Sequence, residues 1–525
     1  MTMILKRLQF LTLILILISI EGRGQAYTSA QIDSLVARLM DTAPLAGMGI
    51  AVVKDGKVVH CKGYGIRAVD DPARVDEHTV FAIASNSKAF TTAALAVLVD
   101  EGKLNWTDRV VDYIPEFRMY NPYVTANFNI LDLLTHRSGL GLGAGDLMFF
   151  PDGGDFTMND VLKSFQYQEP VSAFRTKYDY DNLLYLVAGE VVSRVSGKSW
   201  AEFVKERFME VLGMDDSAPV FHQLEDRSNI AMPHSVNGNE LVQLETYTIP
   251  NASLAAAGGI YASVHDLSRW MMMHLINGMA VGSDNLRLIS EKNHRELWRP
   301  HTNIEFTVIP DNRYNTHFTA YGLGWGIRDR NGLICMEHTG ALPGMLSRTI
   351  LVPELQLGIV VLTNTWPGGN AYRSISQTIL DRYLGLDDFD WIRENKRILT
   401  AQRSEADSVT AAVWETVENN KKTPIDIDML TGMYQDDWFG KVKVWVQDDQ
   451  LWISSLRSPK LNGPMYFYKA NTFAIEWDYQ DMDCDAFASF ILDTEGRATA
   501  IRMKGISPDI DFSFDFHDLD LRRVE

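Results

Sequence analysis

The chain has 525 residues, of which 46% are hydrophobic and 22% charged, and its net charge is −19 at pH 7. This length predicts two to four domains, and the composition is typical of a globular protein with a sizeable core. The acidic balance excludes a nucleic acid or an anionic membrane as the expected partner, because both repel a negative surface.

The first 26 residues have the order of a secretory signal peptide. Lys6 and Arg7 precede an apolar run that ends at Ile20, and small residues follow near Ala26. The alternative is a membrane anchor, but the run is shorter than the ~20 residues that span a bilayer. We therefore expect cleavage, no stable membrane anchor afterwards, and a periplasmic or secreted protein.

The next elements in chain order are a hairpin and a buried helix. Residues 49–65 alternate around Asp55-Gly56, which predicts a tight hairpin turn. Apolar residues then recur at helical spacing after Ser85-Asn86-Ser87-Lys88. Ser85 and Lys88 are three residues apart, so they would share one face of that helix.

Residues 104–250 are predicted to be mostly helical and loop-like. The glycine-rich stretch 139–145 lies within this segment, but it follows polar residues and not a strand. It therefore indicates a plain loop and no nucleotide site.

Strand and turn signals return in residues 321–364, and a helical pattern follows at 371–383. We infer an α+β domain over 27–385, with an antiparallel sheet flanked by helices and a helical insertion at 104–250. Residues 386–424 indicate a helical linker. Residues 425–525 alternate, with turns at Asp448-Asp449 and Glu495-Gly496, and predict a small all-β, lipocalin-like barrel domain.

Three short motifs contain the candidate catalytic and substrate-binding residues. Ser85 is the only serine followed three residues later by a lysine, and Tyr180-Asp181-Asn182 is the only Tyr-x-Asn. His338-Thr339-Gly340 ends a strand-like segment. A serine attacks a carbonyl only when a base takes its proton, and a lysine can be that base only when its pKa lies well below ~10.4. Burial and a nearby positive charge would lower it.

In this order, the motifs resemble those of the penicillin-binding-protein and class C β-lactamase-like serine hydrolases. The segments 133–140, 256–270, 321–327 and 338–347 also look like that family, and the resemblance covers about residues 30–385. It implies a β-lactamase/transpeptidase-like fold. Residues 431–446 are similar to β-barrel modules that are appended to some family members.

The resemblance implies a role for each motif residue. Ser85 is the expected nucleophile, and Lys88 and Tyr180 form a coupled pair in which the choice of general base stays open. The backbone N–H groups of Ser85 and Ala341 would form the oxyanion hole. The expected substrate-binding residues are Asn182, which would bond the substrate or the lysine, His338, Thr339, and Gly340, which would leave room for substrate.

His338 departs from the lysine that many β-lactamases of this family carry. A histidine is mostly neutral at pH 7, so antibiotics that are anchored by a carboxylate should bind less well. We expect His136 to be a loop or packing residue. No metal-binding or nucleotide-binding motif is present in the sequence, and no cofactor is expected.

These observations predict an exported serine hydrolase that acts on a small peptide or ester substrate through an acyl-enzyme. A peptidase of D-amino-acid-containing or short peptides is favoured over a carboxylesterase or a β-lactamase of the same fold. A catalytically silent cell-wall binding or sensor protein is the alternative from another class. The barrel domain is expected to limit access to the site or to support assembly, and the oligomeric state is not predicted.

Overall fold

The computed structural model describes residues 27–71, 73–249, 254–283, 285–305, 312–422 and 424–524. The predicted signal peptide lies outside these residues. Within them, no helix combines the length and the apolar character needed to cross a bilayer.

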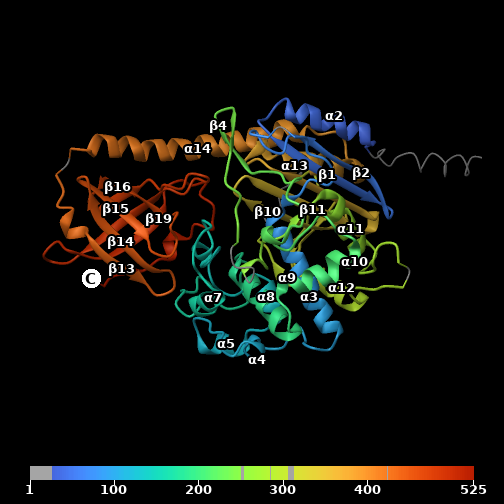
Figure 1. Cartoon of the computed structure of the whole chain (residues 1–525), viewed down its shortest axis with the longest axis horizontal. Coiled ribbons are helices and arrows are strands. Elements are labelled where there is room, and N and C mark those ends of the chain that lie inside the picture. Colours follow the sequence, from blue (N-terminus) through green and yellow to red (C-terminus); the bar gives the residue numbers. More distant parts are fainter. Residues whose placement is uncertain are drawn as a thin grey trace, which may run out of the picture.

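An eight-stranded sheet of antiparallel neighbours forms the centre of the larger domain, in the order β2-β1-β12-β11-β10-β9-β8-β7 (Figure 1). Its strands are β1 Gly47–Lys54, β2 Lys57–Gly65, β7 Thr302–Asn303, β8 Thr319–Tyr321, β9 Gly326–Arg330, β10 Leu333–Leu342, β11 Met345–Val352 and β12 Leu357–Thr363. Asp55 and Gly56 make the β1–β2 turn with φ values of 52° and 71°, as predicted. β1 pairs with β12, so the two ends of the domain meet as neighbouring strands of one sheet.

Helices cover both faces of this sheet. On one face, α2 (Ser29–Met40) and α13 (Ala371–Tyr383) share an apolar cluster with β1 and β12. On the other face, α11 (Val264–Leu275) packs against β1 and β12, and the segment before α3 (Ser87–Asp100) lies against β10 and β11. α3 packs in turn on α8 (Leu183–Ser196), which holds the start of α3 between the sheet and the inserted segment.

The segment between these sheet strands is mostly short helices. They are α4 Val110–Tyr113, α5 Pro122–Asn127, α6 Ile130–Leu134, α7 Met158–Ser164, α9 Trp200–Val204, the π-helical turn Lys205–Met209, α10 Glu210–Leu212 and α12 Glu291–Leu297. It also contains a hairpin, β4 His234–Asn237 and β5 Glu240–Gln243, that the prediction of helices and loops did not include. The missed signal is the two-residue turn Gly238-Asn239, because Gly238 adopts the positive φ of 61° that a tight turn requires. A further short pair joins β3 Phe81–Ala82 to β6 Tyr261–Ala262.

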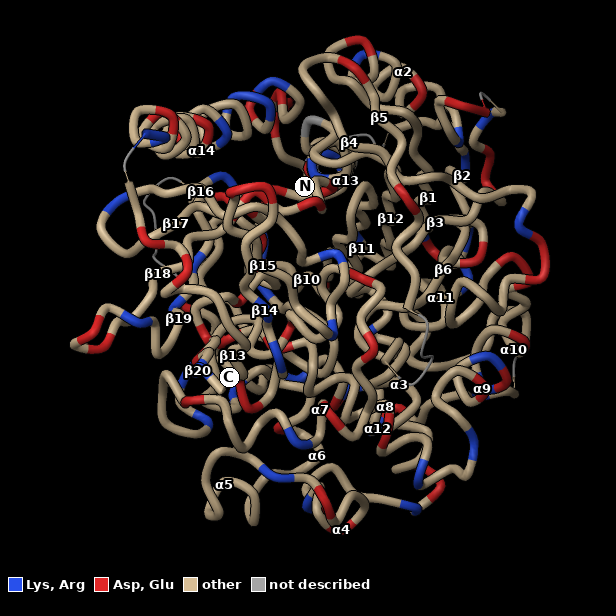
Figure 2. The backbone as a smooth tube through the Cα atoms, turned by 60° about the vertical axis from the view of Figure 1, so that its left-hand side comes forward, with Lys and Arg blue, Asp and Glu red and all other residues tan. Residues whose placement is uncertain are grey.

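A long helix, α14 (Trp391–Asn420), leads from the sheet domain to a closed eight-stranded barrel (Figure 1). The barrel strands are β13 Gly432–Asp436, β14 Gly440–Gln447, β15 Gln450–Ser455, β16 Asn462–Lys469, β17 Thr472–Ile475, β18 Ala486–Leu492, β19 Ala498–Gly505 and β20 Leu521–Arg523. Charged residues of both signs lie along α14 (Figure 2), whereas Val413 and Val417 pack on the barrel. The predicted α+β fold class with an all-β barrel is confirmed.

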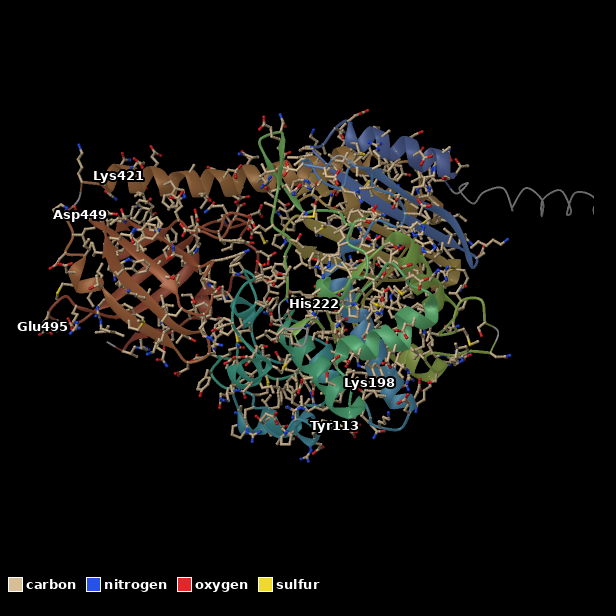
Figure 3. All side chains as sticks on the ribbon, viewed as in Figure 1. Tyr113, Lys198, His222, Lys421, Asp449 and Glu495 are labelled. Atoms are coloured by element: carbon tan, nitrogen blue, oxygen red, sulfur yellow. The ribbon has the colours of Figure 1, made fainter. Side chains whose placement is uncertain are left out.

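The barrel is attached to the inserted segment by buried and charged contacts. Arg457 pairs with Asp155 at 2.7 Å and Asp160 at 3.0 Å, and Lys460 pairs with Asp152 at 2.8 Å. Asp449 and Glu495, which lie in strand turns, mark the barrel end remote from this contact (Figure 3). The opposite end therefore faces the larger domain.

Candidate active site

A cavity of about 460 Å³ lies where β10, the inserted segment and the barrel meet. Six of the residues predicted from sequence line it: Ser85, Tyr180, Asn182, His338, Thr339 and Ala341. The barrel forms part of the same cavity wall through Met482, Phe512 and Ser513. Residues from three separate parts of the chain therefore share one cavity.

Ser85 sits in a tight 3-10 turn, η1 (Ala84–Asn86), directly before α3. Ala84 has a φ of 48°, a conformation that costs a non-glycine residue energy and is held by its surroundings. Asn86 Nδ2 donates to Ser347 Oγ at 2.7 Å, and Ser347 Oγ donates to the Ile83 carbonyl at 2.7 Å. These bonds tie the turn to β11 and fix the Ser85 hydroxyl at the cavity.

Lys88 lies directly beneath Ser85 and is fully buried, with 0% of its surface exposed. Its Nζ donates to Ser85 Oγ at 3.1 Å, to Asn182 Oδ1 at 2.7 Å and to the Ala257 carbonyl at 2.9 Å. Burial lowers the pKa of Lys88 to about 7, although the carboxyl groups of Asp146 and Asp181 oppose this change. A large share of the amine is therefore neutral near pH 7 and able to accept a proton. Of the two partners predicted for Asn182, the structure places the lysine in contact.

Tyr180 stands beside this pair. Lys88 Nζ lies 4.9 Å from the centre of the Tyr180 ring. Burial raises the pKa of the Tyr180 phenol well above its ordinary value, and the neighbouring Ser85 hydroxyl offsets only part of that rise. The phenol is therefore protonated at neutral pH, so it can donate a proton but is a poor base.

His338 is neutral and both of its ring nitrogens are engaged. Nδ1 lies 2.6 Å from the Thr339 carbonyl and Nε2 lies 2.8 Å from the Tyr321 hydroxyl. A carbonyl only accepts, so Nδ1 carries the proton and Nε2 accepts from Tyr321. Burial, with the charge of Lys88, lowers the pKa of His338 to about 4. His338 thus offers no positive charge to the cavity.

Gly340 has a different role from the one expected from sequence. A Cβ atom there would lie 2.3 Å from the Ile83 carbonyl oxygen, 2.5 Å from Ser347 Oγ and 3.0 Å from the Ala84 Cβ. The space beside Gly340 is therefore filled by protein and not by substrate. Its lack of a side chain lets β10 approach the segment that carries Ser85.

His136 is a site residue that the sequence did not reveal. It is buried, and its ring lies 4.2 Å from the Tyr180 ring and 4.5 Å from the Tyr321 ring. Its Nδ1 accepts from the Asp181 N–H at 3.1 Å. The expected packing role is found, but the groups it supports are those of the site. The only sequence signal at this position is the family-like segment 133–140.

A second missed feature is a hydrogen-bonded chain that runs from the barrel to the serine. Ser513 Oγ donates to Asp146 Oδ2 at 3.0 Å, and Asn182 Nδ2 donates to the same oxygen at 2.7 Å. Asn182 then accepts from Lys88 through Oδ1. Burial, aided by Asp515, raises the pKa of Asp146 well above its ordinary value. Through Asp146 and Asn182, the barrel is thus connected by hydrogen bonds to Lys88.

Among the described residues, one group outside the cavity has side chains that could hold a metal ion. Ligand atoms of His78, Asp216 and His265 lie within 4.8 Å of one another. His78 Nδ1 and Asp216 Oδ2 are already hydrogen-bonded at 2.9 Å. None of the three lines the cavity.

The comparisons with known proteins agree with this geometry. The family model described as Beta-lactamase matches residues 32–383. The chain belongs to the β-lactamase family. A second model, described as a domain of unknown function (DUF3471), matches residues 418–523 of this β-lactamase-family chain. The resemblance inferred from the ordered motifs is therefore confirmed.

Curated relatives of this β-lactamase-family chain include the unguisins hydrolase ungD′ of Aspergillus campestris and protein flp of Staphylococcus aureus strain COL. The first is 26% identical over 420 residues, which are 76% of this chain and 74% of the relative. The second is 27% identical over 340 residues, which are 64% of this chain and 62% of the relative. This chain thus matches less than two thirds of protein flp.

Two solved structures show the same fold. The octameric penicillin-binding protein homologue from Pyrococcus abyssi has a TM-score of 0.58 at 20% identity, covering 92% of this chain and 98% of that one. A class C β-lactamase has a TM-score of 0.53 at 20% identity, covering 67% and 94%. The first match extends over most of the chain, whereas the second covers about two thirds of it.

Proposed function

We propose that this protein is an exported serine hydrolase that cleaves amide or ester bonds through an acyl-enzyme, with peptides that are short or contain D-residues as substrates. The observation that carries this proposal is the contact between Ser85 and Lys88. The hydroxyl lies 3.1 Å from a fully buried amine whose pKa falls to about 7. Such a pair supplies both a nucleophile and a base at neutral pH.

In the proposed reaction, Ser85 Oγ attacks the carbonyl carbon while Lys88 Nζ takes the hydroxyl proton. Negative charge develops on the carbonyl oxygen, which the N–H groups of Ser85 and Ala341 would stabilise. The bond to the leaving group breaks as that group receives one proton, either from Lys88 directly or from the Tyr180 phenol, which Lys88 then reprotonates. Lys88 then takes a proton from the water that attacks the ester on Ser85, and returns this proton to Ser85 Oγ as the acid is released.

One observation argues against a β-lactamase. His338 is neutral, so it provides no fixed charge for the carboxylate of a β-lactam. One relative is named an unguisins hydrolase, which supports hydrolysis but does not define the substrate here. Export is part of the proposal because of the sequence pattern of the first 26 residues. Mass analysis of the mature N-terminus tests it, and an intact Met1 on the exported protein would refute cleavage.

The nucleophile is tested by intact mass after treatment with a fluorophosphonate and, separately, with a penicillin. We expect one fluorophosphonate adduct on the wild type, none on Ser85→Ala, and an unchanged adduct on Ser34→Ala, which alters an exposed serine of α2. An adduct that survives in Ser85→Ala would refute the assignment. A penicillin adduct that is lost in the same variant would show that the site accepts a D-Ala-D-Ala mimic.

Peptide preference is tested with D-alanyl and L-alanyl anilides and a matched ester. Faster release from the D-alanyl anilide is expected. Hydrolysis of the ester alone would replace the peptidase proposal by an esterase.

A further inference from the structure

The cavity extends past Thr339 into a cluster of arginines. Arg348 is the cross-strand neighbour of Thr339 on β11. Two further arginines come from β9 and one from α13, and all line the same cavity as Ser85. We call this group the arginine cluster: Arg328, Arg330, Arg348 and Arg373.

A single carboxylate forms ion pairs with this cluster. Glu337 pairs with Arg328 at 2.7 Å, with Arg330 at 2.9 Å and with Arg348 at 2.7 Å. No other carboxylate of the described residues lies within ion-pair distance of these four guanidinium groups. Because Arg373 adds a fourth positive charge, the four guanidinium groups exceed the single carboxylate by three charges, in a chain whose net charge is −19. Excess positive charge is costly at the buried Arg330 and Arg348, whereas Arg328 is partly exposed and Arg373 is exposed; a site of this kind attracts anions.

The cluster also has hydrogen-bond donors that no described protein group satisfies. Arg330 and Arg348 are only 3% and 6% exposed. Nε and Nη1 of Arg330 and Nε of Arg348 are buried and make no hydrogen bond within the described chain. Both side chains are nevertheless held in place, since Arg330 stacks on the Tyr314 ring at 4.6 Å and Arg348 Nη1 donates to Ser376 Oγ at 3.1 Å. Fixed, buried guanidinium donors fit an oxyanion.

We propose that the arginine cluster binds an acidic group of the substrate, a carboxylate or a related oxyanion, while Ser85 reacts with the carbonyl. The proposal rests on the proposed function and narrows its substrate class to anionic compounds. His338 cannot supply the positive charge, because it is neutral and its two nitrogens are occupied. The cluster supplies it farther along the same cavity, beyond Thr339.

The first test measures binding without turnover. In the full-length Ser85→Ala protein, glutarate and inorganic phosphate are each titrated at constant ionic strength while the midpoint of thermal unfolding is followed. Binding to the folded state raises that midpoint. We expect glutarate to raise it, and Arg348→Gln or Arg373→Gln added to this protein to remove the effect. Arg295→Gln, which changes an arginine that is 79% exposed on α12, should keep it. No shift with either anion would refute the site.

The second test compares two esters with five-carbon acyl groups, the mono-4-nitrophenyl ester of glutaric acid and 4-nitrophenyl valerate. We expect the wild type to prefer the anionic ester by at least about tenfold in kcat/KM, because charge-assisted hydrogen bonds are the strong ones. The ratio of the two kcat/KM values should fall toward one in Arg348→Gln and Arg373→Gln. It should take an intermediate value in Arg348→Lys and equal the wild-type ratio in Arg295→Gln. The neutral ester reports any general loss of activity.

Failure of this proposal can be told from failure of the proposed function. If neither ester is hydrolysed and Ser85 takes no fluorophosphonate label, the serine hydrolase proposal fails, whereas the binding test still decides on the anion site. If both esters are hydrolysed with equal kcat/KM, the substrate proposal is refuted. Stabilisation by phosphate without any preference for the anionic ester would also refute it, because the cluster would then hold a free oxyanion.

Discussion

Lys88 sets the pH dependence of acylation if it is the base that activates Ser85. Burial lowers its pKa from 10.5 to about 7, a difference of about 5 kcal/mol between the charged and neutral forms. The neutral fraction is then about 1% at pH 5, about 10% at pH 6 and about 90% at pH 8. The rate of fluorophosphonate labelling should therefore rise about tenfold per pH unit below pH 7 and level off above pH 8.

Asp181 complicates this profile because it titrates in the same range. Burial raises the pKa of Asp181 to about 7, and its carboxylate raises that of Lys88. The two groups are coupled, so the observed midpoint belongs to the pair. Asp181→Asn removes the negative charge, and we expect the midpoint to move to lower pH. His338, with a pKa lowered to about 4, and Tyr180, raised well above 10, do not titrate in this window.

The assay is stopped-time intact mass between pH 5 and pH 10, with the reagent's own hydrolysis subtracted. A labelling rate that keeps rising to pH 10 in both proteins would refute the reasoning. Lys88 would then be charged at neutral pH and would act only as a hydrogen-bond donor.

Three substitutions test the surroundings of the site. Gly340→Ala places a Cβ 2.3 Å from the Ile83 carbonyl oxygen, so it should cost about 1–3 kcal/mol of stability, measured by urea unfolding, and slow labelling; an unchanged rate would contradict the packing role. Ser513→Ala removes the barrel's bond to Asp146 and should slow labelling without changing the unfolding midpoint, so equal rates would exclude the coupling. Phe512→Ala opens the barrel wall and should raise kcat/KM for bulky esters relative to small ones; an unchanged ratio would remove the access role.

Much of the fold was predictable because its signals are local. The β1–β2 turn follows from Asp55-Gly56, and the barrel turn at Asp448-Asp449 has the positive φ values, 51° and 61°, that such a turn requires. The inserted hairpin around Gly238-Asn239 was missed because its strands are only four residues long. Alternation over so few residues is a weak signal.

The sequence by itself determined the fold class and the ordered motifs around Ser85, because spacing along a helix or strand places those side chains on common faces. The tertiary structure decided the charge states of the site residues and which residues from distant parts of the chain contact them. Ser513 meets Asp146 across 367 positions, and Arg348 meets Glu337 through strand pairing. The pKa of Lys88 depends on how completely water is excluded from it, and that exclusion is produced by segments far apart in the chain. The spacing of residues within one motif carries no information about this exclusion of water.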